Sequence, residues 1–206
     1  MTLTAVVTGG SGGIGSEVVR QLRAKGWEAV SLSRREGCDV SSEDQVMKAF
    51  GRLESLDALV NCAAVLVKRP FAELTAQDWD VQLDVGLRGA FLCSREAFKL
   101  MRGRGGSIVM VSSLSGVAGA EKFPGMAAYV AAKSGLAGLT EVLAAEGRGL
   151  GIRVNAISPG SVDTPMLRIA GVEGPALKPA DVARTIVWLA SAESAPLSGA
   201  NLRMDP

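Results

Sequence analysis

The chain has 206 residues, of which 48% are hydrophobic, and a formal net charge of +1. This length suits one domain, over residues 1–206, that buries about 70% of the surface of its unfolded chain. Scattered basic residues argue against nucleic-acid binding, which needs a concentrated basic face. No segment approaches about 18 consecutive apolar residues, which argues against a membrane span. No basic leader precedes the first apolar run, so we expect a cytoplasmic protein.

The residue types also limit the chemistry. The chain has no histidine, so the commonest general base and the commonest zinc ligand are both missing. Hydrolysis by a histidine-containing triad and His-ligated metal chemistry are therefore excluded, and we expect no metal site. The three cysteines, Cys38, Cys62 and Cys93, lack metal-ligand spacing, and we expect reduced, partly buried thiols.

Six short runs rich in Val, Ile and Leu predict β-strands at residues 3–8, 28–33, 58–61, 107–112, 153–157 and 200–204. They do not alternate polar with apolar residues, which is typical of parallel strands buried on both faces. Between them, we expect a helix carrying Ile14, Val18 and Leu22, and further helices at 75–101, 127–146 and 180–191. This alternation predicts an α/β fold of the Rossmann type, a doubly wound parallel sheet with helices on both faces.

The first strand runs into a glycine-rich turn, residues 8–15, which leads directly into the first helix. Glycines permit a tight turn and a close approach to a pyrophosphate, and the helix N-terminus offers free N–H groups to it. The alternative is a tight connection without a ligand, which the placement between a strand and a helix disfavours. The candidate cofactor-binding residues here are Gly9, Ser11, Gly12, Gly13, Ile14 and Gly15.

The second strand should end near the adenosine ribose of such a cofactor. An acidic residue there binds the 2′-hydroxyl of NAD, but this strand ends Ser31-Leu32-Ser33-Arg34-Arg35. Arg34 can pair with a 2′-phosphate and Ser33 can donate to it, which favours NADP(H) over NAD(H). Two exposed arginines in a loop are the alternative interpretation.

Tyr129 is the only tyrosine, and Lys133 follows it four residues later, on the same face of the predicted helix. A free tyrosine has a pKa of about 10, too high for a base at neutral pH. A neighbouring ammonium group and an oxidised nicotinamide would both favour the phenolate. A surface Tyr/Lys pair is the alternative.

Ser113 follows the fourth predicted strand. A serine at the carboxyl end of such a strand points into the crevice where doubly wound folds bind ligands, and its hydroxyl can donate to a substrate oxygen. A turn or helix-cap serine is the alternative.

These motifs, in this order, resemble the short-chain dehydrogenase/reductase family, of the single-domain type that includes 3-oxoacyl-carrier-protein reductases. The resemblance covers residues 3–205. It implies about seven strands in the order 3-2-1-4-5-6-7, and a homodimer or homotetramer formed through the helices at 75–101 and 127–146. Its further motifs are Asp39-Val40, Asn61-Cys62-Ala63-Ala64, Asn155-Ala156-Ile157-Ser158-Pro159-Gly160 and Val162-Asp163-Thr164-Pro165.

The resemblance implies hydride transfer between NADP(H) and a small-molecule carbonyl or secondary alcohol. Tyr129 would exchange a proton with the substrate oxygen, Ser113 would orient that oxygen, and Lys133 would hold the nicotinamide ribose and lower the tyrosine pKa. The remaining cofactor residues would be Asp39 and Val40 at the adenine, Asn61 and Ala63 in the cleft, and Pro159, Gly160, Val162 and Thr164 beside the nicotinamide.

Four features depart from the family pattern. Gly86 replaces an asparagine that holds a water linking the active-site lysine to solvent, so we expect an additional water there and a weakened or rerouted proton relay. The interval from Ser113 to Tyr129 is about three residues longer than usual, within 118–125, and the segment 166–177 is short where relatives have a lid over the substrate. The stretch from 35 to 39 is trimmed, and the run after Asn61 lacks a second asparagine and a final glycine.

A short lid implies a more open pocket, a small or unusual substrate, or weaker exclusion of water. Together with Gly86, it supports a second hypothesis, a catalytically weak NADP(H)-binding regulatory or scaffolding protein on the same fold. The presence of Ser113, Tyr129 and Lys133 in register favours the enzyme.

Overall fold

The computed structural model of the protein describes residues 2–206 and contains one parallel β-sheet. Its strands lie in the order β2-β1-β3-β4-β5-β6. All six strands expected from the sequence are confirmed, and no end is shifted by more than two residues. They are β1 (Thr4–Thr8), β2 (Glu28–Leu32), β3 (Ala58–Asn61), β4 (Gly106–Val111), β5 (Ile152–Pro159) and β6 (Asn201–Met204).

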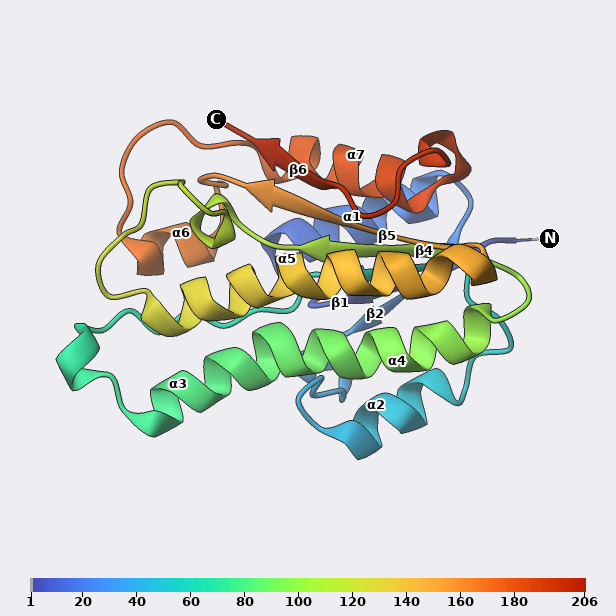
Figure 1. Cartoon of the computed structure of the whole chain (residues 1–206), viewed down its shortest axis with the longest axis horizontal. Coiled ribbons are helices and arrows are strands. Elements are labelled where there is room, and N and C mark those ends of the chain that lie inside the picture. Colours follow the sequence, from blue (N-terminus) through green and yellow to red (C-terminus); the bar gives the residue numbers. More distant parts are fainter. Residues whose placement is uncertain (1) are drawn as a thin grey trace.

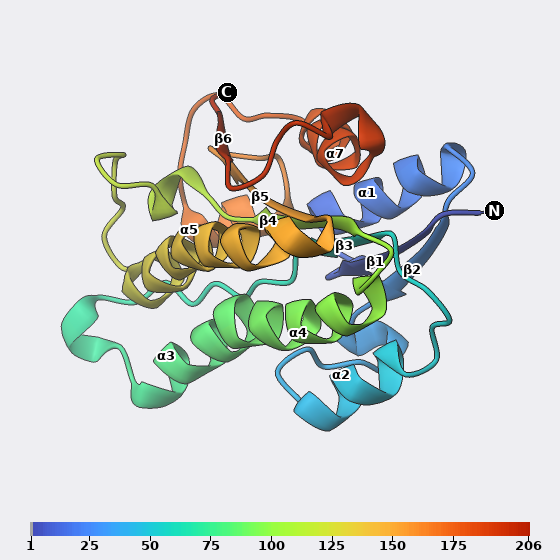
Figure 2. The ribbon, with the colours of Figure 1, turned by 45° about the vertical axis from the view of Figure 1, so that its right-hand side comes forward.

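Helices cover both faces of the sheet, as Figures 1 and 2 show, so the doubly wound fold is confirmed. On one face α1 (Gly13–Ala24) and α7 (Pro179–Ala190) pack side by side, and on the other lie α2 (Glu43–Phe50), α4 (Gly89–Met101) and α5 (Ala127–Gly147). The short α2 is a helix that the sequence patterns did not predict. Within residues 2–206, no helix is both long and apolar enough to cross a membrane.

The long helix expected at 75–101 has an irregular centre. It begins as α3 (Ala76–Leu83), where Thr75 and Asp78 cap the first turn reciprocally. It then widens into a π-helical turn at Asp84–Arg88 before continuing as α4. Gly86 lies inside this turn and is buried, and π-helical turns frequently occur at functional sites.

The sheet has six strands rather than about seven, because it stops at β2. Where the resemblance implies an outer strand, the chain makes a 3₁₀ turn at Arg34–Glu36, passes through Gly37 in the left-handed conformation and reaches α2 at Glu43. A parallel strand needs a crossover connection of about a dozen residues, and this trimmed stretch is too short to provide one. The six strands that are present keep the expected order.

A half-buried arginine, Arg153, joins β5 to the end of α7. The guanidinium of Arg153 donates to the backbone carbonyls of Leu189, Ser191, Ser194 and Leu197 at distances of 2.9–3.3 Å. The carbonyls of Leu189 and Ser191 lie at the negative end of the α7 dipole, where a cation is favourable. Arg153 therefore fixes the helix that covers one face of the sheet.

We expect Arg153→Met to lower the free energy of unfolding by about 2–4 kcal/mol, because it leaves several carbonyls without a donor. Chemical denaturation followed by circular dichroism measures the change. Arg184 on α7 is the matched control: it is largely exposed and pairs only with Asp181 one turn earlier, so Arg184→Met should cost less than about 0.5 kcal/mol. Equal losses in the two variants would contradict the role of Arg153.

Candidate active site

The glycine-rich turn between β1 and α1 has the form of a phosphate-binding loop. Gly9 has a φ of +67°, and a Cβ atom on it would lie 2.9 Å from the Cα of Ala63. The hydroxyl of Thr8 accepts the N–H groups of Cys62 and Ala63, at 3.0 and 3.1 Å, which brings the end of β3 against the turn. The predicted residues Gly9 and Ala63 are therefore neighbours.

The first turn of α1 faces the loop after β5. Gly12 caps this helix without a side-chain hydrogen bond, and the first turn has no acidic residue. A Cβ atom on Gly13 would lie 2.5 Å from the Cγ2 of Thr164, so only glycine permits this approach. A helix N-terminus with uncapped N–H groups, beside a turn this narrow, fits the pyrophosphate of a dinucleotide.

At the position expected for the adenosine of the cofactor, the hydrogen bonds of Ser33 differ from those that the sequence predicts. The hydroxyls of Ser33 and Ser31 both donate to the carboxylate of Glu36, at 2.6 and 2.5 Å. Ser33 is therefore not free to bind a 2′-phosphate until Glu36 moves. Glu36 lies outside the strand and only the 3₁₀ turn folds it back, which is why the sequence pattern did not point to it. Arg34, in the same turn, is exposed.

Asp39 and Val40 are engaged within the protein. The carboxylate of Asp39 accepts the backbone and hydroxyl groups of Ser41, and these hydrogen bonds hold its pKa below the ordinary value, with Arg34 adding to the effect. Val40 is buried, and its side chain packs against Gly89 of α4. Contact of these two residues with an adenine stays a prediction.

Asn61 ends β3 and is almost fully buried. Its amide group donates to the hydroxyl of Ser94 on α4, at 3.0 Å, and to the sulfur of Met110 on β4. Its Oδ1 is buried without a hydrogen-bond partner among the residues that the structure describes. These contacts tie β3 to α4 and β4, so Asn61 organises the sheet beneath the cleft.

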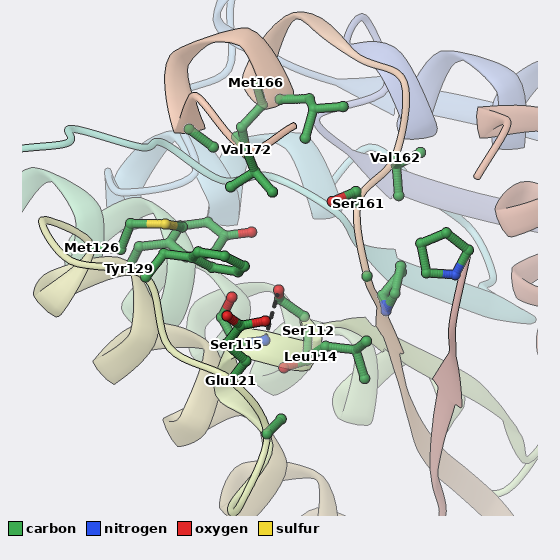
Figure 3. A pocket seen from close by; sticks show the side chains of 18 of the residues that line it. Ser112, Leu114, Ser115, Glu121, Met126, Tyr129, Ser161, Val162, Met166 and Val172 are labelled. Carbon is green, nitrogen blue, oxygen red and sulfur yellow. Dashed lines mark hydrogen bonds between the residues drawn. The ribbon is translucent and has the colours of Figure 1, made fainter. Parts of the chain in front are cut away.

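A cleft of about 480 Å³ lies at the carboxyl ends of the strands, and Figure 3 shows it from close by. It brings together residues that the sequence predicted from separate motifs. They are Ile14, Ser113, Tyr129, Pro159, Gly160, Val162 and Thr164. The other predicted cofactor residues do not line this cleft, and Lys133 is buried beside it.

The end of β4 is joined tightly to α5. The hydroxyl of Ser112 donates to the carbonyl of Lys133 at 2.8 Å, and the hydroxyl of Ser134 donates to the carbonyl of Gly116 at 3.1 Å. A Cβ atom on Gly116 would lie 2.6 Å from the backbone of Lys133, so the segments touch directly. Ser112 is occupied by this contact, which leaves Ser113 as the serine facing Tyr129.

Ser113 and Tyr129 both line the cleft, and Ser113 is close enough to the phenol to affect its pKa. The Ser113 oxygen also accepts the N–H of Ser115, at 3.2 Å. One helical turn along α5, the Nζ of Lys133 lies 5.5 Å from the centre of the tyrosine ring and donates to the carbonyl of Val111 at 2.7 Å. The structure therefore places the three predicted catalytic residues in one constellation.

Burial determines the ionisation of this constellation in the cofactor-free protein. It raises the pKa of Tyr129 to about 12, with the hydrogen bond to Ser113 opposing the shift and Cys62 adding to it. It also lowers the pKa of the Lys133 ammonium to about 8. The loss of water around the phenol therefore opposes the lowering of the tyrosine pKa that is expected from Lys133 and an oxidised nicotinamide, and that lowering stays a prediction.

The segments around the cleft mouth supply residues that the motifs did not indicate. Lys68, after β3, donates its Nζ to the carbonyl of Ala170 at 2.5 Å, which holds the short lid helix α6 (Pro165–Ala170). The lid segment is closed by hydrogen bonds between its two ends, near Ser161 and Leu177. An apolar wall forms from Leu66, Phe123, Met126, Met166, Ala170 and Val172, and charged lining comes from Glu121, Arg203 and Asp205.

Gly86 faces the same helix as Lys133. A Cβ atom there would lie 3.4 Å from the Cβ of Ala132, which is ordinary contact. The surroundings of Gly86 therefore accommodate a Cβ atom. The water expected there and the rerouted proton relay stay predictions.

Residues 9–206 match the family model described as enoyl-(acyl carrier protein) reductase. The chain is 32% identical to a 3-oxoacyl-[acyl-carrier-protein] reductase of Rickettsia bellii, with 98% of this chain and 95% of the relative covered. It is 34% identical to a D-threitol dehydrogenase of Mycolicibacterium smegmatis, over 98% and 90% of the two chains. The protein belongs to the short-chain dehydrogenase/reductase family.

The solved structure of an aldohexose dehydrogenase from Thermoplasma acidophilum, in ligand-free form, superposes with a TM-score of 0.91. It is 27% identical and covers 99% of this chain and 92% of its own. The alignment with the Rickettsia reductase extends over 232 residues, against 206 in this chain, so that relative carries segments that are absent here. The sheet, which has no strand beyond β2 among residues 2–206, agrees with this difference.

The pKa of Tyr129 can be measured without any substrate, because the chain has no other tyrosine. At pH of about 10, half of an exposed tyrosine is ionised, whereas a pKa of about 12 leaves Tyr129 almost entirely neutral. We expect the ultraviolet absorbance of tyrosinate to stay low at this pH and to rise when NADP⁺ adds a positive charge. Tyr129→Phe provides the blank. Half-ionisation at pH of about 10, with circular dichroism unchanged, would contradict the effect of burial.

Proposed function

We propose that the protein is an NADP(H)-dependent oxidoreductase that interconverts a small-molecule carbonyl compound and its secondary alcohol. The observation that carries this proposal is the constellation of Tyr129, Ser113 and Lys133 in the cleft beside the loop from Pro159 to Thr164. Family membership supports the class of reaction, because the relatives named above are reductases and dehydrogenases. NAD(P)(H) supplies or accepts the hydride when it is bound.

The ionisation of the cleft suits reduction at neutral pH. Because burial holds the pKa of Tyr129 at about 12, the phenol keeps its proton and can donate it to the substrate oxygen as negative charge develops there. The oxygen of Ser113 accepts the N–H of Ser115, and its hydroxyl turns from Tyr129 to donate to the same substrate oxygen when a ketone is bound. Each reduction thus consumes one hydride and one proton, and both go to the carbonyl group.

Lys133 acts on this reaction from below the cleft. Below pH of about 8 it is an ammonium group, held in place by the carbonyl of Val111. Its positive charge stabilises the phenolate that remains after proton donation, and the family resemblance gives it the nicotinamide ribose as a second partner. In the direction of alcohol oxidation, the same charge lowers the cost of using Tyr129 as a base.

We propose NADP(H) as the preferred cofactor because of Arg34. Its guanidinium is exposed at the end of β2 and can pair with a 2′-phosphate. Glu36 opposes this preference, since its carboxylate occupies the hydroxyls of Ser31 and Ser33. Binding of the 2′-phosphate requires this carboxylate to swing away, which the exposed 3₁₀ turn permits.

We also propose a homodimer or homotetramer. Apolar side chains are exposed on the two helices that the family resemblance assigns to subunit contacts, Phe91 on α4 and Val142 on α5. Burial of these side chains against a second copy would remove apolar surface from water.

The central test of the enzyme is Tyr129→Phe. We expect it to lower the rate of ketone reduction by a factor of about 100 or more, because the proton donor is lost. NADPH binding, measured by fluorescence titration, should be unchanged. The wild-type protein is assayed by NADPH oxidation with a panel of ketones and 3-oxoacyl thioesters. Tight NADPH binding with no turnover, and no effect of Tyr129→Phe, would instead support the regulatory or scaffolding hypothesis.

The cofactor preference is tested by two substitutions with opposite effects. Arg34→Ala should weaken NADPH binding about tenfold and leave NADH binding unchanged, because only NADPH has the 2′-phosphate. Glu36→Gln should strengthen NADPH binding, because it removes a like charge from the same position. Arg52→Ala, at an exposed arginine beyond α2, is the control. The preference would be overturned if the wild type bound NADH more tightly than NADPH and if Glu36→Gln weakened the binding of NADH.

A further inference from the structure

The loop between β4 and α5 places a carboxylate in the reaction cleft. Glu121 lines the same cleft as Tyr129 and Ser115, and Figure 3 shows it among the side chains below the tyrosine. It lies in the loop between the 3₁₀ turn at Leu114–Gly116 and α5. This loop therefore brings a charged group to the cleft in which the substrate would bind.

The loop that carries Glu121 has a defined shape. The Nζ of Lys122 donates to the carbonyls of Val117 and Ala120, both at 2.7 Å, so this cation closes the loop on itself. At the far end of the loop, the carbonyl of Gly125 accepts the N–H of Arg69 at 2.9 Å. These contacts hold the backbone on both sides of Glu121, and they keep the adjacent ammonium group away from its carboxylate.

Within residues 2–206, the carboxylate of Glu121 takes part in no ion pair. The other charged residues of the cleft, Arg203 and Asp205, come from β6 and the residues after it, and they bring one charge of each sign. The ammonium group of Lys133 lies buried beside the cleft, so the negative charge of Glu121 acts on its own side of the cleft and not on the cleft as a whole. That side disfavours the carboxylate of a keto acid and favours a substrate that offers hydrogen-bond donors.

The rest of the lining limits the shape of that substrate. Apolar side chains from the lid and the β3–α3 loop, Met166, Val172 and Leu66, cover one side of the cleft near Tyr129. A ketone whose oxygen lies between Tyr129 and Ser113 therefore meets an apolar surface on one side. On another side it meets the carboxylate of Glu121, which can accept hydrogen bonds from hydroxyl groups of the ketone.

We propose that Glu121 selects a hydroxylated ketone, and in the reverse direction the corresponding polyol, by accepting hydrogen bonds from its hydroxyl groups. This inference rests on the proposed function, since it names the substrate class of the same cleft. A carboxylate accepts hydrogen bonds through both oxygens and has no proton to donate at neutral pH, so it distinguishes a hydroxyl-bearing carbon from a methyl or methylene carbon.

The test compares matched ketones that differ only in hydroxyl groups: dihydroxyacetone with acetone, and erythrulose with butanone. The measured quantity is the ratio of kcat/KM within each pair, compared between wild type and variant, because differences in intrinsic reactivity then cancel. Glu121→Ala should lower kcat/KM for the hydroxylated ketone about tenfold and leave that for its partner within about twofold. Glu121→Gln, which keeps an acceptor oxygen but not the charge, should fall between wild type and Glu121→Ala.

Glu173→Gln is the matched control, because Glu173 is an exposed carboxylate like Glu121 but does not line the cleft. It should leave both ketones unchanged. Equal losses on both members of a pair in Glu121→Ala, or no change in the ratio, would overturn the inference. The inference would also be overturned if the wild type preferred aminoacetone to hydroxyacetone and Glu121→Ala removed this preference, because the carboxylate would then select an ammonium group.

The proposed function and this inference fail in different ways. If the wild type reduces butanone but discriminates against erythrulose, the proposed oxidoreductase activity is supported and the proposed role of Glu121 is overturned. If neither ketone is reduced, calorimetry of erythrulose with the NADPH-bound protein decides the inference alone. Binding that Glu121→Ala abolishes supports the hydroxyl site without catalysis, and no binding to the wild type overturns it.

Discussion

Lys133 is buried where the end of β4 meets α5, and its backbone and side chain both bond to that strand. Its carbonyl accepts the hydroxyl proton of Ser112, and its ammonium group donates to the carbonyl of Val111. Gly116 permits this closeness, because a Cβ atom there would collide with the backbone of Lys133. Since Ser113 lies on one side of the junction and Tyr129 on the other, the distance between them depends on these contacts.

The same junction explains the ionisation of the site. Packing Lys133 under the cleft removes water from it and from the tyrosine above it, so the pKa of the ammonium falls while that of the phenol rises. Neither shift follows from the spacing of the two residues, which is compatible with an exposed helix face. A neutral phenol beside a cation that titrates near neutral pH is poised to donate a proton.

The protein reaches this arrangement with a smaller framework than its relatives. The connection from Ser33 to α2 forms no outer strand, and the lid segment contains one short helix, α6, whose last residue is held by Lys68. The cleft keeps its apolar wall because Met126, Met166 and Val172 still meet there. In our proposal, Glu121 on the β4–α5 loop contributes the substrate specificity that a longer lid would otherwise provide.

The sequence by itself determined the features that depend on local periodicity and spacing. Apolar runs predicted six strands, the glycines at 9–15 predicted a turn that only small residues can form, and four residues between Tyr129 and Lys133 put both on one helix face. Each of these is a property of a short segment, so no knowledge of distant contacts was needed. The helix α2 was missed because it has only eight residues, although Ser42 caps its first turn and Val46 and Phe50 form an apolar stripe on one face.

Only the tertiary structure decided what each side chain meets. It turned Glu36 back onto Ser31 and Ser33, buried Val40 against α4, and occupied Ser112 with a carbonyl from another segment. It also raised the pKa of Tyr129, because desolvation is produced by segments far apart in the chain that close over one group. Contacts of this kind depend on where loops of particular length return, and a linear pattern does not contain that information.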